Sequence, residues 1–184
     1  YLDHSGGMVR GVRTDQNGLY TTEPLIPSTY YLVFEASGYI SESYHDREPY
    51  WGDPLSLTSA NLTGIDAALE PAALLAGRVS AVDGSEPVLA ELTLGTDEAQ
   101  AIHFRNDYSL SARGEFAIEV RPGNYPLYAA PIEPYNQEYQ GEYFDHVYSL
   151  SEAIVLQLPA GTTKNKVWFG LDDSGGKISG RSTS

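Results

Sequence analysis

The sequence predicts an all-β chain of two consecutive β-sandwich domains, with little or no helix. Three observations lead to this prediction: the composition, a period-2 alternation of apolar residues in short segments, and an internal repeat. The 184 residues include 18 Gly, 11 Pro and 14 Tyr, with no Cys. This composition favours short strands and many turns over long helices. Two domains of about one hundred residues would each have enough chain for a hydrophobic core.

In the first half of the chain, turn residues separate short segments with strand character. TDQNGLYTTEPL and IPSTYYLVFEASGY follow one another, with Gly18 and Pro27 as turn residues. A Tyr-rich connection, GYISESYHDREPYWGD, then leads to the apolar strand PLSLT. In the closing segment GIDAAL, the apolar residues Ile65, Ala67 and Leu69 share one face.

The second half has the same order, with one more hairpin at its start. The segment LLAGRVSAV is followed by the turn DGSEP and by a second strand, AELTLG, from Ala90. ARGEFAIEV and RPGNYPLYAAP come next, with turns at Gly114 and Pro122. The connection PYNQEYQGEYFDHVYSLSEA, the strand AIVLQL and the closing strand NKVWFGL complete the copy. Trp168 lies opposite the face of Val167 in that last strand, so it is either exposed or packed against a neighbouring domain.

The two halves align at a period of about one hundred residues. Pro27 and Pro122 are 95 apart (122 − 27), and Leu69 and Leu171 are 102 apart (171 − 69). Such a period fits whole domains and is too long for a solenoid repeat. The predicted domains are therefore residues 1–73, a module that lacks its N-terminal strand; residues 74–174, a complete module; and residues 175–184, the opening strand of a third.

The motifs of the two copies resemble the carboxypeptidase regulatory-like modules of bacterial secreted and surface proteins, which are related to collagen-adhesin B-type domains. The order of the motifs, repeated twice, carries the resemblance: Ala76-Gly77-Arg78-Val79, Thr14-Asp15-Gln16-Asn17-Gly18-Leu19-Tyr20, Arg121-Pro122-Gly123-Asn124-Tyr125, Glu142-Tyr143-Phe144-Asp145 and Thr63-Gly64-Ile65-Asp66-Ala67-Ala68-Leu69. The resemblance implies tandem Greek-key sandwiches of the prealbumin-like type, and an extracellular or cell-surface location in a bacterium. Ser28 departs from the pattern, because the family usually has Gly there.

Charge and missing motifs exclude several classes of function. The formal charge is −14, from 25 acidic and 11 basic residues, so most faces would repel nucleic acid and anionic membranes. No apolar run approaches the length of about 20 residues that spans a bilayer. The chain has no Gly-x-Ser-x-Gly elbow, no phosphate-binding Gly-rich loop and no thiol. We therefore expect a protein that is not an enzyme.

Aromatic residues in the two Tyr-rich connections are candidates for ligand binding. Their flat rings could stack on sugars while nearby acids accept hydrogen bonds from hydroxyl groups. The alternative is that most of these rings cap the edge of the sandwich. The candidates are Tyr44, Tyr50, Trp51, Tyr139 and Tyr143.

Acidic turns leave calcium as the one cofactor to consider, because hard cations bind several oxygen ligands in a tight turn. The candidate ligands are Asp15, Asn17, Asp172 and Asp173. None of them follows the alternating Asp run of a dedicated calcium loop, and ordinary turn chemistry is the favoured interpretation. His45 and His146 occupy matching places beside acids, which could indicate a repeated site. The favoured interpretation is that each is a surface imidazole next to a solvated acid.

These observations favour a non-catalytic stalk, spacer or interaction module of a larger surface or secreted protein. The alternative is a carbohydrate-binding accessory module of a secreted polysaccharide-active enzyme. Expected partners are neighbouring modules of the same parent chain, and a glycan or a host or surface protein. One further hypothesis is a strand-exchanged homo-oligomer, in which Lys177 to Ser184 of one molecule fills the first module of another.

Overall fold

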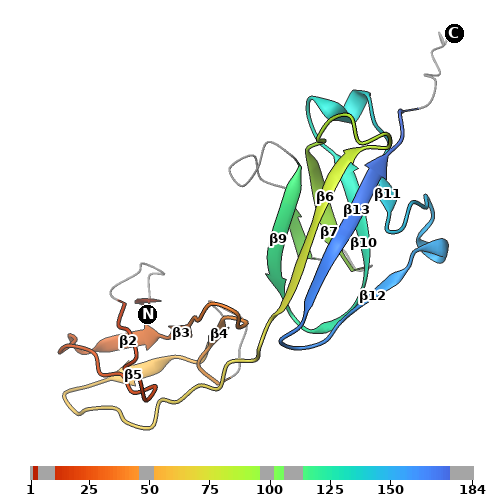
Figure 1. The fold of residues 1–184 in the computed structure, drawn as a ribbon. Helices are drawn as coiled ribbons and strands as arrows, with labels where there is room; N and C mark the ends of the chain where they lie inside the picture. The colour runs from red at the N-terminus through yellow and green to blue at the C-terminus, as the bar shows by residue number, and fades with distance from the viewer. Residues whose placement is uncertain (1, 4–10, 46–51, 96–101, 106–113, 175–184) are drawn as a thin grey trace, which may run out of the picture. The chain divides into compact units, whose positions relative to one another are not determined.

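The computed structural model describes residues 2–3, 11–45, 52–95, 102–105 and 114–174 (Figure 1). The chain divides into two compact units, residues 1–71 and 72–184. The all-β prediction is confirmed, since the helical segments among the described residues are two short 3-10 turns, Tyr135–Gln137 and Leu150–Glu152. A helix long and apolar enough to cross a bilayer does not occur in this part of the chain. The strand predicted at 175–184 lies outside the described residues.

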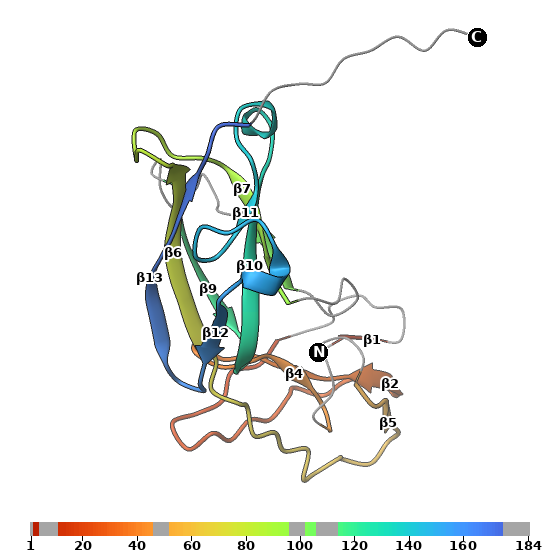
Figure 2. The same ribbon diagram turned by 90° about the vertical axis from the view of Figure 1, so that its right-hand side faces the viewer.

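The second unit is a sandwich of two sheets, which Figure 2 shows from the side. The first sheet has the strand order β13 (Thr163–Leu171), β6 (Ala73–Ala81), β9 (Glu115–Val120). Its central strand β6 runs parallel to β13 and antiparallel to β9. The first and last strands in the described part of this unit are therefore neighbours in one sheet.

The second sheet of this unit is antiparallel throughout. Its strand order is β11 (Glu142–Tyr143), β10 (Gly123–Pro131), β7 (Ala90–Leu94), β8 (Ile102–Arg105), and β12 (Val155–Leu158) also pairs with β10. The chain passes from the first sheet to the second after β6 and again after β9.

The core of the second unit lies between its two sheets, and it follows the period-2 alternation of the sequence. Every second residue of β6 and β7 faces inward, as the burial of Leu75, Val79 and Leu92 shows. The fully buried side chains with the largest volumes include Phe169, Leu75, Leu92, Leu94, Leu127, Leu158 and Leu171. This contiguous apolar layer holds the sheets together, at about 25 cal/mol for each Å² of apolar surface removed from water.

The first unit forms two small sheets. One has the order β1 (Leu2–Asp3), β2 (Ser28–Tyr31), β5 (Leu55–Leu57), and the other pairs β3 (Val33–Phe34) with β4 (Glu42–Ser43). Among the described residues of this unit, Tyr30 is the one buried apolar side chain, at 3% exposure.

Two strands predicted in the first unit, within residues 14–25 and 64–69, do not form. Their counterparts in the second unit are β9 and β13, and both of those pair with β6. The described residues of the first unit contain no counterpart of β6, so these two segments have no strand between them to pair with. A hydrogen bond from the Tyr20 hydroxyl to the Ile65 carbonyl, at 2.6 Å, links them instead.

The predicted repeat recurs in the strand register of the two units. Tyr30 pairs with Leu55 in the first unit as Tyr125 pairs with Leu156 in the second. The same correspondence holds for Phe34 with Glu42 and Ala129 with Glu142, and for the isolated bridges Tyr39 with Pro71 and Tyr139 with Asp173. The two halves therefore share backbone pairing as well as sequence motifs.

Candidate functional site

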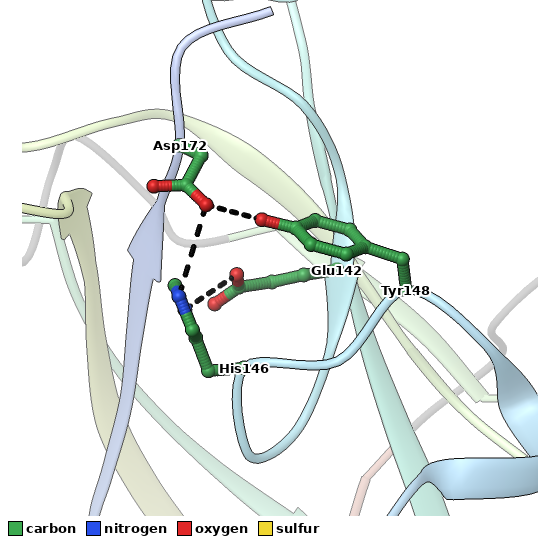
Figure 3. Close-up of polar contacts among 4 residues, drawn as sticks. All are labelled: Glu142, His146, Tyr148 and Asp172. Atoms are coloured by element: carbon green, nitrogen blue, oxygen red, sulfur yellow. Dashed lines mark hydrogen bonds and ion pairs between the residues drawn. The ribbon is translucent and has the colours of Figure 1, made fainter.

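The most distinctive polar site in the second unit is a group of four side chains, Glu142, His146, Tyr148 and Asp172 (Figure 3). We call it the Glu142 cluster. Glu142 lies on β11, His146 and Tyr148 lie in the loop that follows it, and Asp172 comes directly after β13. The cluster thus connects β11, at the edge of the second sheet, with the end of β13 in the first sheet.

Glu142 is buried, with only 1% of its side chain exposed. Its carboxylate faces the His146 imidazole and the backbone of Gly170. Burial therefore raises the pKa of Glu142 to about 7, with His146 opposing the shift and Asp172 adding to it. A carboxyl of this kind changes its charge near neutral pH.

The other three residues form the exposed rim of the cluster. His146 Nδ1 lies 3.0 Å from Glu142 Oε2, and His146 Nε2 lies 3.7 Å from Asp172 Oδ2. The Tyr148 hydroxyl donates a hydrogen bond to Asp172 Oδ2, which raises the pKa of Tyr148 to about 12. One imidazole therefore faces two carboxylates, as Figure 3 shows.

Backbone geometry fixes the position of this imidazole. His146 has a φ of 59°, and its counterpart His45 in the first unit has a φ of 65°. Non-glycine residues rarely adopt this left-handed conformation, and His is among the residue types enriched in it. His45 Nδ1 contacts Asp53 Oδ2 at 2.9 Å, with both side chains exposed. Both units thus have this turn, but among the described residues a buried carboxyl lies against the imidazole in the second unit alone.

The described ligand candidates occupy three different environments. Tyr139 is buried, and its hydroxyl donates a hydrogen bond to Glu86, so its ring presents no free face. Tyr143 is half-buried and packs against Tyr128, with ring centroids 4.7 Å apart. Tyr44 stacks on His45 at 3.8 Å. Tyr50 and Trp51 lie outside the described residues.

The calcium candidates serve other contacts in the structure. Asp15 Oδ1 accepts hydrogen bonds from the backbone amides of Asn17 at 2.8 Å and Leu19 at 2.9 Å, and these bonds lower the pKa of Asp15. Asp172 belongs to the Glu142 cluster, and Asp173 forms a backbone bridge with Tyr139. Within the described residues, no group of three His, Asp or Glu side chains could hold a metal ion.

Sequence reasoning did not single out Glu142 or the surroundings of Trp168. Trp168 is 63% exposed and lines a groove of about 770 Å³ on the outer face of the β13-β6-β9 sheet. The alternation of β13 carried the signal for Trp168, because its neighbours Val167 and Phe169 face the core. For Glu142, the signal was that the first copy also has an acid, Glu42, at the equivalent position.

Comparisons with protein-family models, curated proteins and solved structures find no match to this chain.

Proposed function

We propose that the chain is a pair of non-catalytic, prealbumin-like modules that serves as a stalk, spacer or interaction segment of a larger bacterial surface or secreted protein. The observation that carries the proposal is the repeat of backbone pairing between the two units. The strand orders of the second unit also support the proposal. If β6 is counted as strand 1 and β11 and β12 together as strand 6, the two sheets have the orders 3-2-5-6 and 4-1-7. These orders fit a Greek-key module of the kind that the sequence motifs imply.

The junction between the units also supports a spacer role. Pro71 still bridges to Tyr39 within the first unit, and the Ala72 carbonyl already accepts a hydrogen bond from Gly161 within the second, at 3.0 Å. No free residue separates these two contacts. A junction of this length restricts the angles available to successive modules, unlike a long Gly/Ser linker.

Small-angle X-ray scattering on a chain that ends at Gly175, which we expect to be monomeric, tests the spacer role. We expect a maximum dimension close to the sum of the two units' lengths. The radius of gyration should not change with salt concentration. As a control, a variant with a Gly/Ser insertion between Pro71 and Ala72 should give a broader distance distribution. A compact particle with the units side by side would overturn the proposal.

A specific observation favours strand exchange as an additional property. In the second unit, β6 passes between Phe116 and Val167 at Gly77, where a Cβ would lie 1.8 Å from the Val167 carbonyl oxygen. Tyr20 and Ile65 are the counterparts of that pair in the first unit, and we expect a strand added there to need glycine at the same position. The segment KISGRSTS (177–184) has Gly180 at the position of Gly77.

Sedimentation equilibrium tests this exchange. We expect the full chain to form oligomers, and a chain that ends at Gly175 to be monomeric. Gly180→Val should behave like the truncated chain, because a branched side chain would collide where Gly77 is accommodated. Oligomers that persist in both variants would exclude Lys177–Ser184 as the exchanged strand.

A further inference from the structure

The outer face of the β13-β6-β9 sheet, which faces the viewer in Figure 1, has a groove that the structural role does not explain. Its volume is about 770 Å³, and its lining comes from the three strands and from Val82 and Gly84 just after β6. Trp168 lies in it with 63% of the residue exposed. An exposed indole at a hollow in a sheet face is a typical contact point for a ligand.

The strand register places three large side chains in one row across this face. Trp168 on β13 pairs with Arg78 on β6, and Arg78 pairs with Glu115 on β9. All three point away from the core, because their neighbours Val79, Phe116 and Val167 are buried. The row therefore offers an apolar ring, a guanidinium and a carboxylate along one line.

Small residues flank this row on both sides. The pairs are Ala76 with Ala117 and Ser80 with Gly170. Gly170 has a packing reason, because a Cβ there would lie 3.2 Å from the Cα of Val82. Ala and Gly are depleted in strands, where larger side chains usually cover the sheet. Their presence here leaves the hollow beside Trp168 open.

A bulge in β13 adds polar groups to the rim of the groove. The register between β13 and β6 shifts between Lys164 and Val167, and Lys166 has a φ of 60°. Gly77 permits this bulge, because a side chain there would collide with the Val167 carbonyl. As a result, Asn165 and Lys166 line the groove.

The charge of this groove differs from that of the whole chain. The formal charge of the chain is −14, yet the charged residues that line the groove are Arg78, Lys166 and Glu115. Arg78 Nε is buried and has no hydrogen-bond partner among the described residues, although Nη2 donates to the Gly84 carbonyl at 3.4 Å. A buried donor without an acceptor is unfavourable.

We propose that this groove binds an acidic saccharide, with a sugar ring stacked on Trp168 and its carboxylate bound by Arg78 and Lys166. The indole covers the apolar face of the ring, and guanidinium groups bind carboxylates through paired hydrogen bonds. Glu115, Asn165 and Ser80 are placed to meet sugar hydroxyls. The remaining negative charge of the chain is screened beyond about 8 Å at physiological ionic strength.

Tryptophan fluorescence tests this binding site directly. The chain has two Trp, so Trp51→Phe leaves Trp168 as the sole tryptophan of the full-length protein. We expect tetragalacturonate to change the emission of this variant in a saturable way, and added NaCl to weaken the binding. The matched control Trp168→Phe, which keeps Trp51, should show no saturable change.

Two further comparisons fix the chemistry of the ligand. Arg78→Gln in the Trp51→Phe background should weaken tetragalacturonate binding about tenfold or more, the equivalent of about 1.4 kcal/mol, while circular dichroism and the unfolding midpoint stay unchanged. Neutral maltotetraose should bind at least about tenfold more weakly than tetragalacturonate. No saturation up to about 10 mM, equal binding of the two sugars, or binding unaffected by Arg78→Gln would each overturn the proposal. None of these outcomes depends on the spacer role, which scattering tests separately.

Discussion

His146 Nδ1 lies 3.0 Å from Oε2 of Glu142, a carboxyl whose side chain is 1% exposed. The imidazole reaches this position from a left-handed turn, at a φ of 59°. An exposed ring that covers a buried acid couples the stability of the loop after β11 to protonation. The cluster therefore makes the second unit sensitive to pH near neutrality.

We predict that the free energy of unfolding of the second unit decreases as pH rises from about 4.5 to about 7, the range set by the ordinary and the raised pKa of Glu142. A raised pKa means that the folded state binds more protons than the unfolded state in this range, so the contribution is complete below it and lost above it. Hydrogen bonds with Ser85 lower the pKa of Asp83 in the same unit, so Asp83 acts in the opposite direction at more acidic pH. Urea denaturation at a series of pH values checks the slope.

Glu142→Gln provides the control for this prediction. The amide has the shape of the carboxyl without its charge, so we expect the slope between pH 4.5 and 7 to flatten. At pH 8 the variant should be more stable than the wild type by on the order of 1–3 kcal/mol. If the variant kept the wild-type slope, another group would be responsible for the pH dependence.

Removing the imidazole should have the opposite effect at high pH. His146→Ala leaves an ionised Glu142 buried without its nearest partner, which costs about 1–3 kcal/mol at pH 8 and less at pH 5. Because Ala also disfavours the left-handed backbone, His146→Asn is the matched variant, since Asn tolerates that conformation and keeps a donor. A loss that is equal at both pH values would assign the effect to the backbone alone.

The repeated tyrosines should contribute equally to their units. The Tyr125 hydroxyl donates a hydrogen bond to the Arg121 carbonyl at 3.2 Å, and the Tyr30 hydroxyl donates to the Ile26 carbonyl at 2.8 Å. Each Tyr→Phe change removes one such bond and should cost about 1 kcal/mol. Thermal unfolding should show one transition affected in each single variant, and additive losses in the double variant. Pro27 to Tyr30 and Pro122 to Tyr125 share the pattern Pro-x-x-Tyr. If neither Tyr→Phe variant lost stability, the hydroxyl would not be the reason for this shared pattern.

The strands of the second unit could be predicted well because each has its own local signal in the sequence. Alternation within AELTL and FAIEV coincides with β7 and β9, and the turn residues Gly114 and Pro122 lie between strands. The first unit was predicted less well for a non-local reason. Ile65, Ala67 and Leu69 have the alternation of a strand, but a strand needs a hydrogen-bonded neighbour, and their counterpart β13 obtains it from β6.

The candidate site was harder to predict for a related reason. Glu142 stands in an acidic, Tyr-rich segment that suggests solvent exposure, but it is buried where β11 pairs with β10 and the His146 imidazole lies over it. Tyr139 shows the same difficulty. Its Tyr-rich segment suggested a ligand-binding surface, but Tyr139 forms a backbone bridge with Asp173 and its ring is buried. Burial of single residues in short connections depends on distant strands, so alternation alone cannot assign it.

Gly77 should be the least replaceable residue of the motif Ala76-Gly77-Arg78-Val79. A Cβ at this position would lie 1.8 Å from the Val167 carbonyl oxygen and 2.7 Å from the Phe116 ring. The first contact involves backbone that is already bulged between Lys164 and Val167, so Val167 cannot move without disturbing the β6–β13 pairing. Phe116 is held in the core, where it is buried. We expect Gly77→Ala to destabilise the second unit by about 3 kcal/mol or more, as overpacking in a core does.

Gly11→Ala is the matched control, because no atom of the described residues lies within 4 Å of the Cβ it would add. Its effect on stability should stay within about 0.5 kcal/mol. Differential scanning calorimetry of both variants compares them directly, and hydrogen exchange at β13 should increase in Gly77→Ala alone. If both variants unfolded at the wild-type temperature, the close approach of β13 to β6 at Gly77 would not constrain the fold, and the glycine of the motif would need a different explanation.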